Sequence, residues 1–422
     1  MHEHHAHTPG TSGFYGLGIA PSILEILERL HFVTPTPIQA QAIPVAIEGK
    51  DVVGIAQTGT GKTMAFGIPM MQRLAIEKKQ GLVVAPTREL ALQIDDVFRK
   101  IGTGVNLRTA VLIGGASMQA QVQALGRKPH IIVATPGRLI DHLNQRTLRL
   151  NGVGIVVLDE ADHMLDMGFL PQIQKILAAV PKERQTMLFS ATMPSEIMKL
   201  AGAHMKLPIR VEIAPAGTTV EGVQQELFIV SADRKLALLK KILETYHGST
   251  LVFTRTKHGA KKVTRDIRAF GFSAAEIHSN RSLSQRKEAL QGFKSGKYRV
   301  LVATDIAARG IDVVGIELVL NYDLPSTSDD YVHRIGRTAR AGAAGHAITF
   351  AQPGQQNEVR SIERLIRKSL SVSKLPELSA LPTPPPIIVT RTSRQREGRQ
   401  QRRERPEPYY DYGRRRRPMG RY

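Results

Sequence analysis

Three carboxylates stand directly after a short apolar segment in the first half of the chain. The apolar residues are Ile155–Leu158, and Asp159, Glu160 and Asp162 follow them. A short apolar run of this kind predicts a parallel strand that is buried on both faces. Open α/β sheets bind ligands at the carboxyl ends of their strands. The three acids therefore stand where they can hold a hard cation and activate a water molecule.

A glycine-rich segment upstream supplies a matching phosphate site. Ala56–Thr63 reads AQTGTGKT and follows a second predicted strand, Asp51–Ile55. Its glycines let the backbone fold around phosphate oxygens, Lys62 can reach the β- and γ-phosphates, and Thr63 can ligate Mg²⁺. The strict motif starts with Gly where this chain has Ala56. A turn of this composition is sometimes only a helix cap, but the acids downstream favour a nucleotide site.

The acids divide into two expected roles. Mg²⁺ usually takes one or two carboxylates together with phosphate oxygens and water, and Asp159 is the best candidate, through a bound water. Glu160 is the candidate that orients and deprotonates the attacking water. The alternative is a carboxylate pair that merely caps the following helix. The combination with the glycine-rich loop indicates a nucleoside triphosphatase that uses ATP and Mg²⁺.

Length and composition exclude several classes of protein. The 422 residues suffice for two or three domains, and the hydrophobic content of 42% is ordinary for a globular chain. The absence of cysteine excludes disulfide frameworks and thiolate metal sites, and it fits a reducing, cytoplasmic setting. No apolar run is long enough for a membrane span, and the His-rich start, which we interpret as a solvated end, has no secretory signal.

The charge balance indicates a polyanionic partner. The formal net charge is +21, and residues 376–422 hold 12 Arg, no Lys and 5 acids, a net charge of +7 that leaves +14 for the rest. Such an excess is typical of nucleic-acid binding. The chain has no Trp and only 5% aromatic residues, so contacts to the phosphate backbone are favoured over base stacking.

The order of patterns along the chain predicts two α/β blocks, residues 14–208 and 223–370, each with a doubly wound parallel sheet. Helical patterns such as Glu89–Lys100 alternate with strands. The expected strands are Asp51–Ile55, Leu82–Ala85, Thr109–Ile113, His130–Ala134, Ile155–Leu158 and Thr186–Phe189, then Glu226–Val230, Thr250–Phe253, Ala274–Ile277, Arg299–Ala303, Ile316–Leu320 and Ala347–Phe350. Residues 209–222 are expected to form a flexible hinge, and residues 1–13 and 371–422 to be disordered.

Asp159–Asp162 spells DEAD, and the chain resembles the DEAD-box RNA helicases over roughly Phe14–Leu370, with the family's motifs in the family's order. The segment Ala161–Phe169, ADHMLDMGF, and the basic tail resemble the bacterial RhlE-type branch. The resemblance implies two tandem RecA-like domains, ATP hydrolysis coupled to RNA binding, and local separation of short duplexes.

The resemblance also implies roles for individual residues. A Q motif in residues 12–40 would place Phe32 against the adenine ring and Gln39 at its edge. The remaining ATP contacts would come from the loop and from motif V, namely Ala56, Gln57, Thr58, Gly59, Thr60, Gly61, Lys62, Thr63 and Asp312. Residues that couple hydrolysis to strand separation would be Asp162, Ser190, Ala191, Thr192 and His333. RNA contacts would come from Pro86, Thr87, Arg88, Gly115, Thr135, Pro136, Gly137, Arg138, Arg255 and Thr304.

Two arginines near the end of the second block complete the expected catalytic set with Lys62, Asp159 and Glu160. Arg337 and Arg340 lie in HRIGRTAR, residues 333–340, which resembles the arginine-finger motif. A finger that stabilises the γ-phosphoryl charge is worth roughly 10³–10⁵ in rate. On a helical turn the two arginines would share a face, and Arg334 could approach the same side. Catalysis would then require the two blocks to close. In isolation such arginines are more often surface ion pairs.

Four positions differ from the family's usual pattern without removing a charge or ligand that hydrolysis needs. They are His31, Ala339 and Ser279, each at a position where Gly is common, and Thr60, where Ser is frequent.

The segment Arg391–Arg421, which mixes Arg with Tyr, is expected to tether RNA. Two rival interpretations remain, a non-enzymatic RNA clamp that uses ATP as a latch, and a DNA translocase with the same core. Ribosomal precursors and the RNA-decay machinery are plausible partners.

Overall fold

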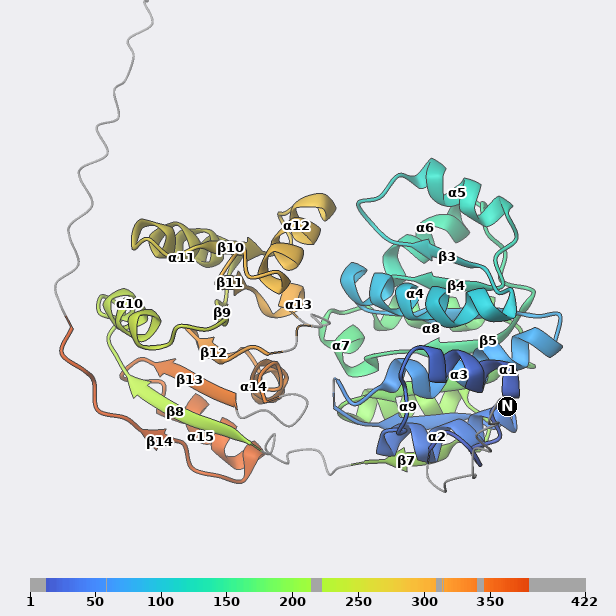
Figure 1. The fold of residues 1–422 in the computed structure, drawn as a ribbon, viewed down its shortest axis with the longest axis horizontal. Coiled ribbons are helices and arrows are strands. Elements are labelled where there is room, and N and C mark those ends of the chain that lie inside the picture. Colours follow the sequence, from blue (N-terminus) through green and yellow to red (C-terminus); the bar gives the residue numbers. More distant parts are fainter. Residues whose placement is uncertain are drawn as a thin grey trace, which may run out of the picture. The chain divides into compact units, whose positions relative to one another are not determined.

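The computed structural model describes residues 13–57, 59–213, 222–308, 313, 315–339 and 345–378. Within this part the chain forms two lobes, each built on one seven-stranded sheet in which every pairing is parallel. We call residues 13–213 the first lobe and the described residues from 222 onward the second lobe. The predicted fold class, two doubly wound parallel-sheet domains in tandem, is confirmed (Figure 1).

The first lobe orders its strands β3-β4-β2-β5-β6-β1-β7. These strands are β1 Val52–Ile55, β2 Gln80–Val84, β3 Thr109–Leu112, β4 Ile131–Ala134, β5 Val153–Leu158, β6 Gln185–Ser190 and β7 Ile209–Glu212. The helices are α1 Pro21–Arg29, α2 Pro37–Ile47, α3 Lys62–Ile76, α4 Arg88–Gly102, α5 Met118–Gly126, α6 Pro136–Asn144, α7 Ala161–Asp166, α8 Leu170–Ala179 and α9 Ser195–His204, with a 3₁₀ turn at Thr103–Val105.

The second lobe orders its strands β10-β11-β9-β12-β13-β8-β14. These strands are β8 Val223–Ile229, β9 Thr250–Phe253, β10 Ala274–Ile277, β11 Val300–Ala303, β12 Leu318–Asn321, β13 Gly345–Ala351 and β14 Ser371–Val372. The helices are α10 Lys235–Thr245, α11 Lys257–Ala269, α12 Leu283–Lys294, α13 Asp305–Ala308, α14 Ser328–Ile335 and α15 Gln356–Ile366.

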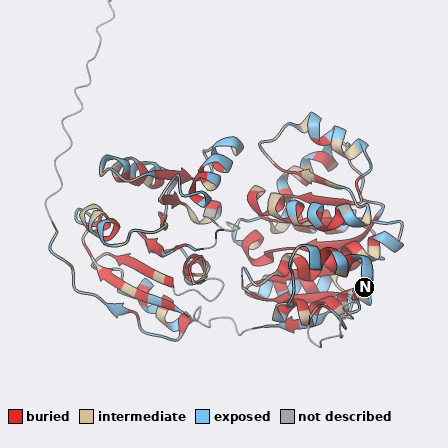
Figure 2. Ribbon diagram, viewed as in Figure 1, coloured by how far each residue is buried: buried red, intermediate tan, exposed pale blue. Residues whose placement is uncertain are grey.

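Each sheet buries side chains on both faces, as the apolar strand sequences require. In β5, Ile155 and Val157 join the core under α1 to α4, whereas Val156 and Leu158 join the core under α6 to α9. This alternation follows from the two-residue period of a strand. Figure 2 shows the central strands of both sheets as buried, with exposed residues on the outer helix faces. The carboxyl ends of the strands therefore project from a rigid, packed layer.

The order of the central strands decides where the site residues meet. Strand β6 lies between β1 and β5, and it pairs with both. The phosphate loop follows β1, the DEAD segment follows β5, and Ser190 ends β6. The coupling residues after β6 consequently lie between the phosphate loop and the acids, although they follow both in sequence.

Two edge strands lie in segments for which the sequence predicted no regular structure. Residues 209–212, expected as the start of the hinge, form β7 and pair with β1 from Val52↔Ile209 onward. Ser371 and Val372, expected as the start of a disordered tail, form β14 beside β8. Three of the four β7 residues and both β14 residues are exposed, so neither strand carries the apolar run by which the central strands were recognised.

The other predicted strands are confirmed within a few residues, and α4 covers the predicted helix Glu89–Lys100. One strand is displaced, because β12 begins at Leu318 and Ile316 instead forms an isolated bridge with Thr338. The N-terminal histidines, most of the hinge and the Arg-rich tail lie outside the described residues. No helix in the described ranges combines the length and apolarity that a membrane span requires.

Strand β1 contains a glycine whose replacement tests the packing under the phosphate loop. A Cβ at Gly54 would lie 2.5 Å from Cε1 of Phe189, whose fully buried ring packs in a tilted arrangement against Phe66, with 5.3 Å between the ring centroids. We expect Gly54→Ala to lower the free energy of unfolding by about 1–3 kcal/mol, as is usual for overpacked cores. Chemical denaturation measures this. Gly152→Ala, where a Cβ meets nothing within 4 Å, is the matched control, and equal stability of the two variants would contradict the packing argument.

Candidate active site

The loop between β1 and α3 is shaped by two glycines with left-handed backbone angles. Gly59 has φ +86° and Gly61 has φ +88°, a region that residues with a Cβ rarely adopt. A Cβ on Gly61 would also lie 2.3 Å from the side-chain nitrogen of Gln39. The loop thus brings the start of α3, and with it Lys62 and Thr63, to the carboxyl end of β1. Thr58 lies outside the described residues.

Lys62 is buried and bound within its own loop. Its Nζ donates to the carbonyl oxygen of Ala56 at 2.9 Å. Thr60 closes the loop by donating to the carbonyl of Gln57 at 2.7 Å. An ammonium has three N–H donors, and one described carbonyl takes one of them, which suits this amine to phosphate oxygens. The amine is therefore placed for the role that the sequence predicted.

The Q-motif residues approach this loop from α2. Gln39 donates through Nε2 to the carbonyl of Gly61 at 3.0 Å, and its Oε1 accepts from the Thr36 amide at 2.9 Å, which completes a capping box at the start of α2. Gln39 therefore fixes the phosphate loop, a contact that the sequence did not reveal. Phe32 is 42% exposed, as a residue that stacks on an adenine ring must be. The predicted adenine contacts of both residues stay predictions.

Asp159, the first of the acids, is 2% exposed at the carboxyl end of β5. Its Oδ1 accepts from the Glu160 amide at 2.9 Å. Burial raises the pKa of Asp159 to about 7, against the opposing charge of Lys62 and with the help of the neighbouring acids. A carboxylate that is destabilised by burial gains strongly from a cation, so the position suits a metal ligand.

Glu160 occupies a strained backbone position at the start of α7, with φ +50° and ψ +54°. Its Oε2 lies 3.1 Å from Nδ1 of His163. Burial would raise the pKa of Glu160, but the hydrogen bond and charge of His163, with the charges of Lys62 and Arg337, lower it to about 2. The carboxylate is thus held in the ionised form that a base requires. His163 was not predicted as a site residue from the sequence. Its position three residues after Glu160, at the start of a helix, could have indicated a contact between the two side chains.

Asp162 joins the DEAD segment to the end of β6. Its Oδ2 accepts from the amides of Ala191 and Thr192 at 3.0 and 2.8 Å and from the Thr192 hydroxyl at 3.1 Å. The Asp162 amide in turn donates to the hydroxyl of Ser190 at 3.1 Å. Burial opposes the ionised carboxylate, but His333, Lys62 and the Thr192 amide together lower the pKa of Asp162. The predicted coupling residues are therefore brought together.

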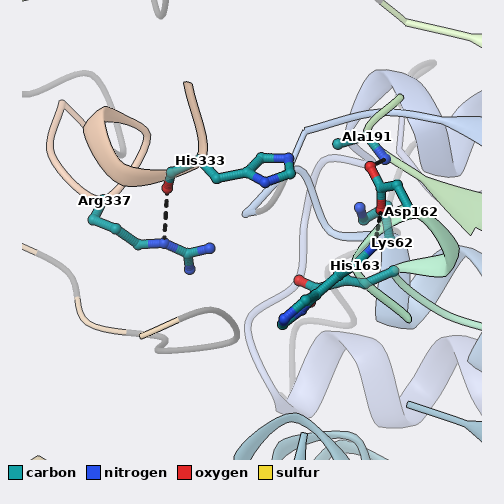
Figure 3. A pocket seen from close by; sticks show the side chains of 7 residues that line it. Lys62, Asp162, His163, Ala191, His333 and Arg337 are labelled. Carbon is teal, nitrogen blue, oxygen red and sulfur yellow. Dashed lines mark hydrogen bonds and ion pairs between the residues drawn. The ribbon is translucent and has the colours of Figure 1, made fainter. Parts of the chain in front are cut away.

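One pocket collects residues from both lobes. Lys62, Glu160, Asp162, His163 and Ala191 of the first lobe line it, together with His333 and Arg337 of the second lobe. Figure 3 shows His333 reaching toward Asp162 and Ala191, with Arg337 held by a bond from its Nε to the His333 carbonyl at 3.2 Å. Five of the predicted catalytic and coupling residues thus share a pocket with Arg337, a predicted arginine finger. Arg340 and Asp312 lie outside the described residues.

The expected helical turn through the arginine fingers is wrong. Helix α14 ends at Ile335, and the Thr338 hydroxyl donates a hydrogen bond to the Ile316 carbonyl at 2.5 Å. Arg334 does not approach the fingers' side. It is buried and pairs with Asp305 at 2.5 Å, because a guanidinium inside the lobe needs a carboxylate partner. Ala339, at a position where the family often has Gly, adopts φ +52°, which accounts for that preference.

The predicted RNA-contacting segments of the first lobe lie at neighbouring strand ends. Thr87 caps α4 by accepting from the Leu90 amide at 3.2 Å. Gly115 has φ +77°, and a Cβ there would meet the Arg88 guanidinium at 2.4 Å. Arg138 donates to the Ala116 carbonyl at 3.0 Å. Pro86, Thr135 and Pro136 are buried, whereas Gly137 is exposed. These arginines brace the glycine loop that would face a phosphate backbone.

An ion pair that the sequence did not predict joins the two lobes. Both guanidinium nitrogens Nε and Nη2 of Arg286 donate to the Glu89 carboxylate, at 2.7 and 2.6 Å. Both side chains are buried. Arg255, a predicted RNA contact of the second lobe, is exposed; its amide donates to Asp323 and its guanidinium to the Leu324 carbonyl, while Thr304 directly follows β11. The predicted RNA contacts of Arg255 and Thr304 stay predictions.

The donor set fits Mg²⁺ bound together with a nucleotide. Within the described ranges no group of three or more His, Cys, Asp and Glu residues is arranged to hold a metal ion alone. Asp159 and Thr63 instead offer one carboxylate and one hydroxyl beside the phosphate loop. Mg²⁺ completes such a set with phosphate oxygens and water. The site therefore fits the ion only when a nucleoside triphosphate supplies the remaining ligands.

Comparisons with family models give two matches. Residues 36–200 match the DEAD/DEAH box helicase model, and residues 234–342 match the helicase conserved C-terminal domain model. A protein of Geobacillus kaustophilus named DEAD-box ATP-dependent RNA helicase CshA is 44% identical over 86% of this chain and 79% of its own length. The ATP-dependent rRNA helicase RRP3 of Yarrowia lipolytica is also 44% identical, over 85% of this chain and 76% of its own length.

Solved structures resemble both lobes together. Dbp5 of S. cerevisiae bound to RNA and ADP BeF3 gives a TM-score of 0.79 at 28% identity, over 86% of this chain and 96% of its own. Mss116p bound to single-stranded RNA and AMP-PNP also gives a TM-score of 0.79, at 29% identity, over 86% of this chain and 78% of its own. Both relatives therefore bind RNA and a nucleotide on a fold like this one.

The hydrogen bonds of Asp162 generate a prediction. An asparagine keeps the shape of the side chain but loses its charge and one acceptor, so a donor would face the amides of residues 191 and 192 or that of His163. Lost hydrogen bonds to a charged group cost about 1.5–3 kcal/mol, so we expect Asp162→Asn to lower the rate of ATP-driven strand separation about tenfold or more. A duplex-separation assay measures it. Asp166→Asn, at the exposed end of α7, is the control, and equal rates in the two variants would refute the role.

Proposed function

Because the chain is a member of the DEAD-box family of ATP-dependent RNA helicases, with two RecA-like domains, we propose that its lobes form an ATP- and RNA-dependent clamp whose hydrolytic site is completed across the lobes. The supporting observation is the shared pocket, where Lys62 and Glu160 of the first lobe meet Arg337 of the second. Neither lobe alone holds the full set. Hydrolysis thus depends on the arrangement of both lobes, and RNA bound across them can control it.

In the proposed reaction, Lys62 and the loop amides hold the β- and γ-phosphates. Thr63 and Asp159 would hold Mg²⁺, which would supply positive charge next to the phosphate oxygens. Glu160 accepts a proton from water as the water oxygen bonds to the γ-phosphorus. The bond from that phosphorus to the bridging oxygen breaks, and its electron pair leaves with ADP. Arg337 and Arg340 stabilise the charge that develops on the phosphoryl oxygens.

Coupling to RNA is proposed to run through the Asp162 network. Asp162 bonds the residues after β6 on one side and shares its pocket with His333 on the other. The contacts to RNA are proposed to be with its backbone, from the Arg88, Gly115 and Arg138 region and from Arg255 and Thr304. Such contacts are independent of sequence, and 2′-hydroxyl groups would distinguish RNA from DNA. Short duplexes would be separated locally, as the clamp bends one strand.

Several finer assignments are also proposals. The bacterial RhlE-type branch is supported only by the ADHMLDMGF segment and the basic tail, and the bacterial relative reported above carries the name CshA. A cytoplasmic location is supported by the lack of cysteine in the sequence, which fits a reducing compartment. Ribosomal precursors and RNA-decay machinery as partners rest on the sequence-independent mode of binding.

The decisive experiment is steady-state ATP hydrolysis by the full chain without nucleic acid, with single-stranded RNA and with DNA of matching sequence. We expect stimulation by RNA alone, because the proposed contacts distinguish the sugar. Binding of RNA and ATP without hydrolysis would favour the clamp that uses ATP as a latch. Equal stimulation by DNA would favour the translocase.

Glu160→Gln tests the assigned base in the same assay. The amide keeps the size of the side chain but cannot accept the proton, so we expect hydrolysis to fall by about 10²–10⁴, the usual worth of a general base, while ATP binding persists. Fluorescent-nucleotide binding supplies the second measurement. Turnover at the wild-type rate would refute the role of Glu160.

Removal of the Arg-rich tail tests its proposed contact with RNA. Residues 380–422 carry 12 Arg and 4 acids, a net charge of +8, while Leu375 and Leu378 before them pack against the second lobe and should be kept. We expect the truncated chain to bind RNA more weakly and with a shallower dependence on salt, since each lost phosphate contact removes about 0.7 from the logarithmic slope for a single strand. Titrations at several salt concentrations measure this. An unchanged slope would show that the tail does not contact phosphate.

A further inference from the structure

We propose that His163 is a positioning residue for Glu160, which holds the carboxylate in the orientation that lets it accept the proton of the attacking water. The inference rests on the proposed role of Glu160 as the base. Nothing in the family resemblance assigns a role to His163. It lines the same pocket as Glu160, Lys62 and Arg337, and Figure 3 shows its ring beside Lys62 and Asp162.

The contact between the two side chains is direct and sheltered from solvent. Nδ1 of His163 lies 3.1 Å from Oε2 of Glu160, and the side chains are 2% and 8% exposed. With its proton on Nδ1, the imidazole donates to the carboxylate, and water cannot easily compete for either partner. A hydrogen bond to a charged acceptor is shorter and stronger than a neutral one, particularly where the local dielectric is low.

The backbone around Glu160 is fixed on both sides. Its amide donates to Asp159 at 2.9 Å, and its carbonyl accepts from the Met164 amide at 3.0 Å. The left-handed angles of Glu160 are a costly conformation for a residue with a Cβ, and these bonds hold it there. The point from which the side chain leaves the backbone is therefore determined, and only its own torsions remain to be restricted.

The usual way to restrict an N-cap side chain is closed to Glu160. A residue at this position normally accepts a hydrogen bond from the amide two or three residues into the helix. Here the amide of the third residue, His163, donates instead to Oδ1 of Asp162 at 2.9 Å, and Glu160 makes no capping bond of its own. The imidazole of the same residue takes over as the anchor. The backbone amide of His163 thus donates to Asp162, whereas the imidazole of His163 donates to Glu160.

This division of donors has a consequence for hydrolysis. The hydrogen bond from His163 engages Oε2 of Glu160, so we expect Oε1 to accept the proton of the attacking water. Holding a glutamate in one rotamer costs side-chain entropy, and the hydrogen bond to His163 offsets that cost before the nucleotide binds. Catalytic groups that are displaced by about 1 Å can lose 10²-fold in rate. The anchor is therefore expected to affect turnover and to leave substrate binding unchanged.

His163→Leu removes the donor and keeps much of the volume. We expect the RNA-stimulated kcat of the full chain to fall about 10- to 100-fold, with the KM for ATP and the affinity for RNA changed less than about threefold. His163→Asn should restore much of the lost kcat, because its side-chain N–H stands close to the position of Nδ1. A kcat for His163→Leu within twofold of the wild type would overturn the proposal.

A double variant separates positioning from a merely structural role. If His163 acts through Glu160, the Leu substitution should have little further effect on the residual turnover of Glu160→Gln, since residues that act as a unit are not additive. An equal loss in both backgrounds would show a structural role and refute the inference. If Glu160→Gln itself hydrolysed ATP normally, the assignment of the base would fail instead, so the two failures are distinguishable.

The matched control is the other fully buried histidine of the first lobe. His142 on α6 bonds Thr147 and Gln121 and lies outside the pocket. His142→Leu also removes a buried imidazole, so it should lower the thermal unfolding temperature while kcat at saturating RNA stays near the wild type. A loss of kcat in this control as large as in His163→Leu would show that any buried histidine has the same effect, and would contradict a specific role.

Discussion

The burial of three carboxylates at the end of one strand is the constraint on which the rest of the site depends. Isolated charges in the interior are unfavourable, so each acid must find its own compensation. Among the described residues, Asp159 accepts one backbone hydrogen bond and lies near the charge of Lys62, which leaves it suited to a cation. Glu160 is hydrogen-bonded to the imidazole of His163, and Asp162 accepts hydrogen bonds from the amides after β6. Adjacent acids thus acquire different protonation behaviour and different tasks from their surroundings alone.

The order of strands in the sheet makes these compensations available. Because β6 lies between β1 and β5, the segment after it reaches both the phosphate loop and the acids. The Ala56 amide donates to Ser190 at 3.0 Å, while the Ser190 hydroxyl accepts from Asp162. Two hydrogen bonds at Ser190 therefore link the phosphate loop directly to the DEAD segment.

Arginines on the second lobe show how similar side chains acquire separate functions. Arg334 is buried with Asp305 inside its own lobe, Arg286 pairs with Glu89 of the first lobe, and Arg337 lines the pocket that it shares with Lys62 and Glu160. All three side chains are guanidinium cations, and only their partners differ. A paired and buried arginine is costly to change, whereas an arginine in a pocket is placed to meet a ligand's charge. The proposed hydrolytic site depends on Arg337, the arginine in the pocket.

The sequence alone determined the fold class, most strands and the membership of the phosphate loop and the acids in one site. These features follow from short-range patterns, namely apolar runs, glycines before Lys62 and acids at a strand end, whose physical meaning is local. The edge strands β7 and β14 were missed because exposed strands carry no apolar run. Only the tertiary structure showed that Arg334 turns inward, that Glu89 pairs with Arg286 and that His163 holds Glu160. Each of these depends on which donor reaches which buried acceptor, and packing decides that after the chain has folded.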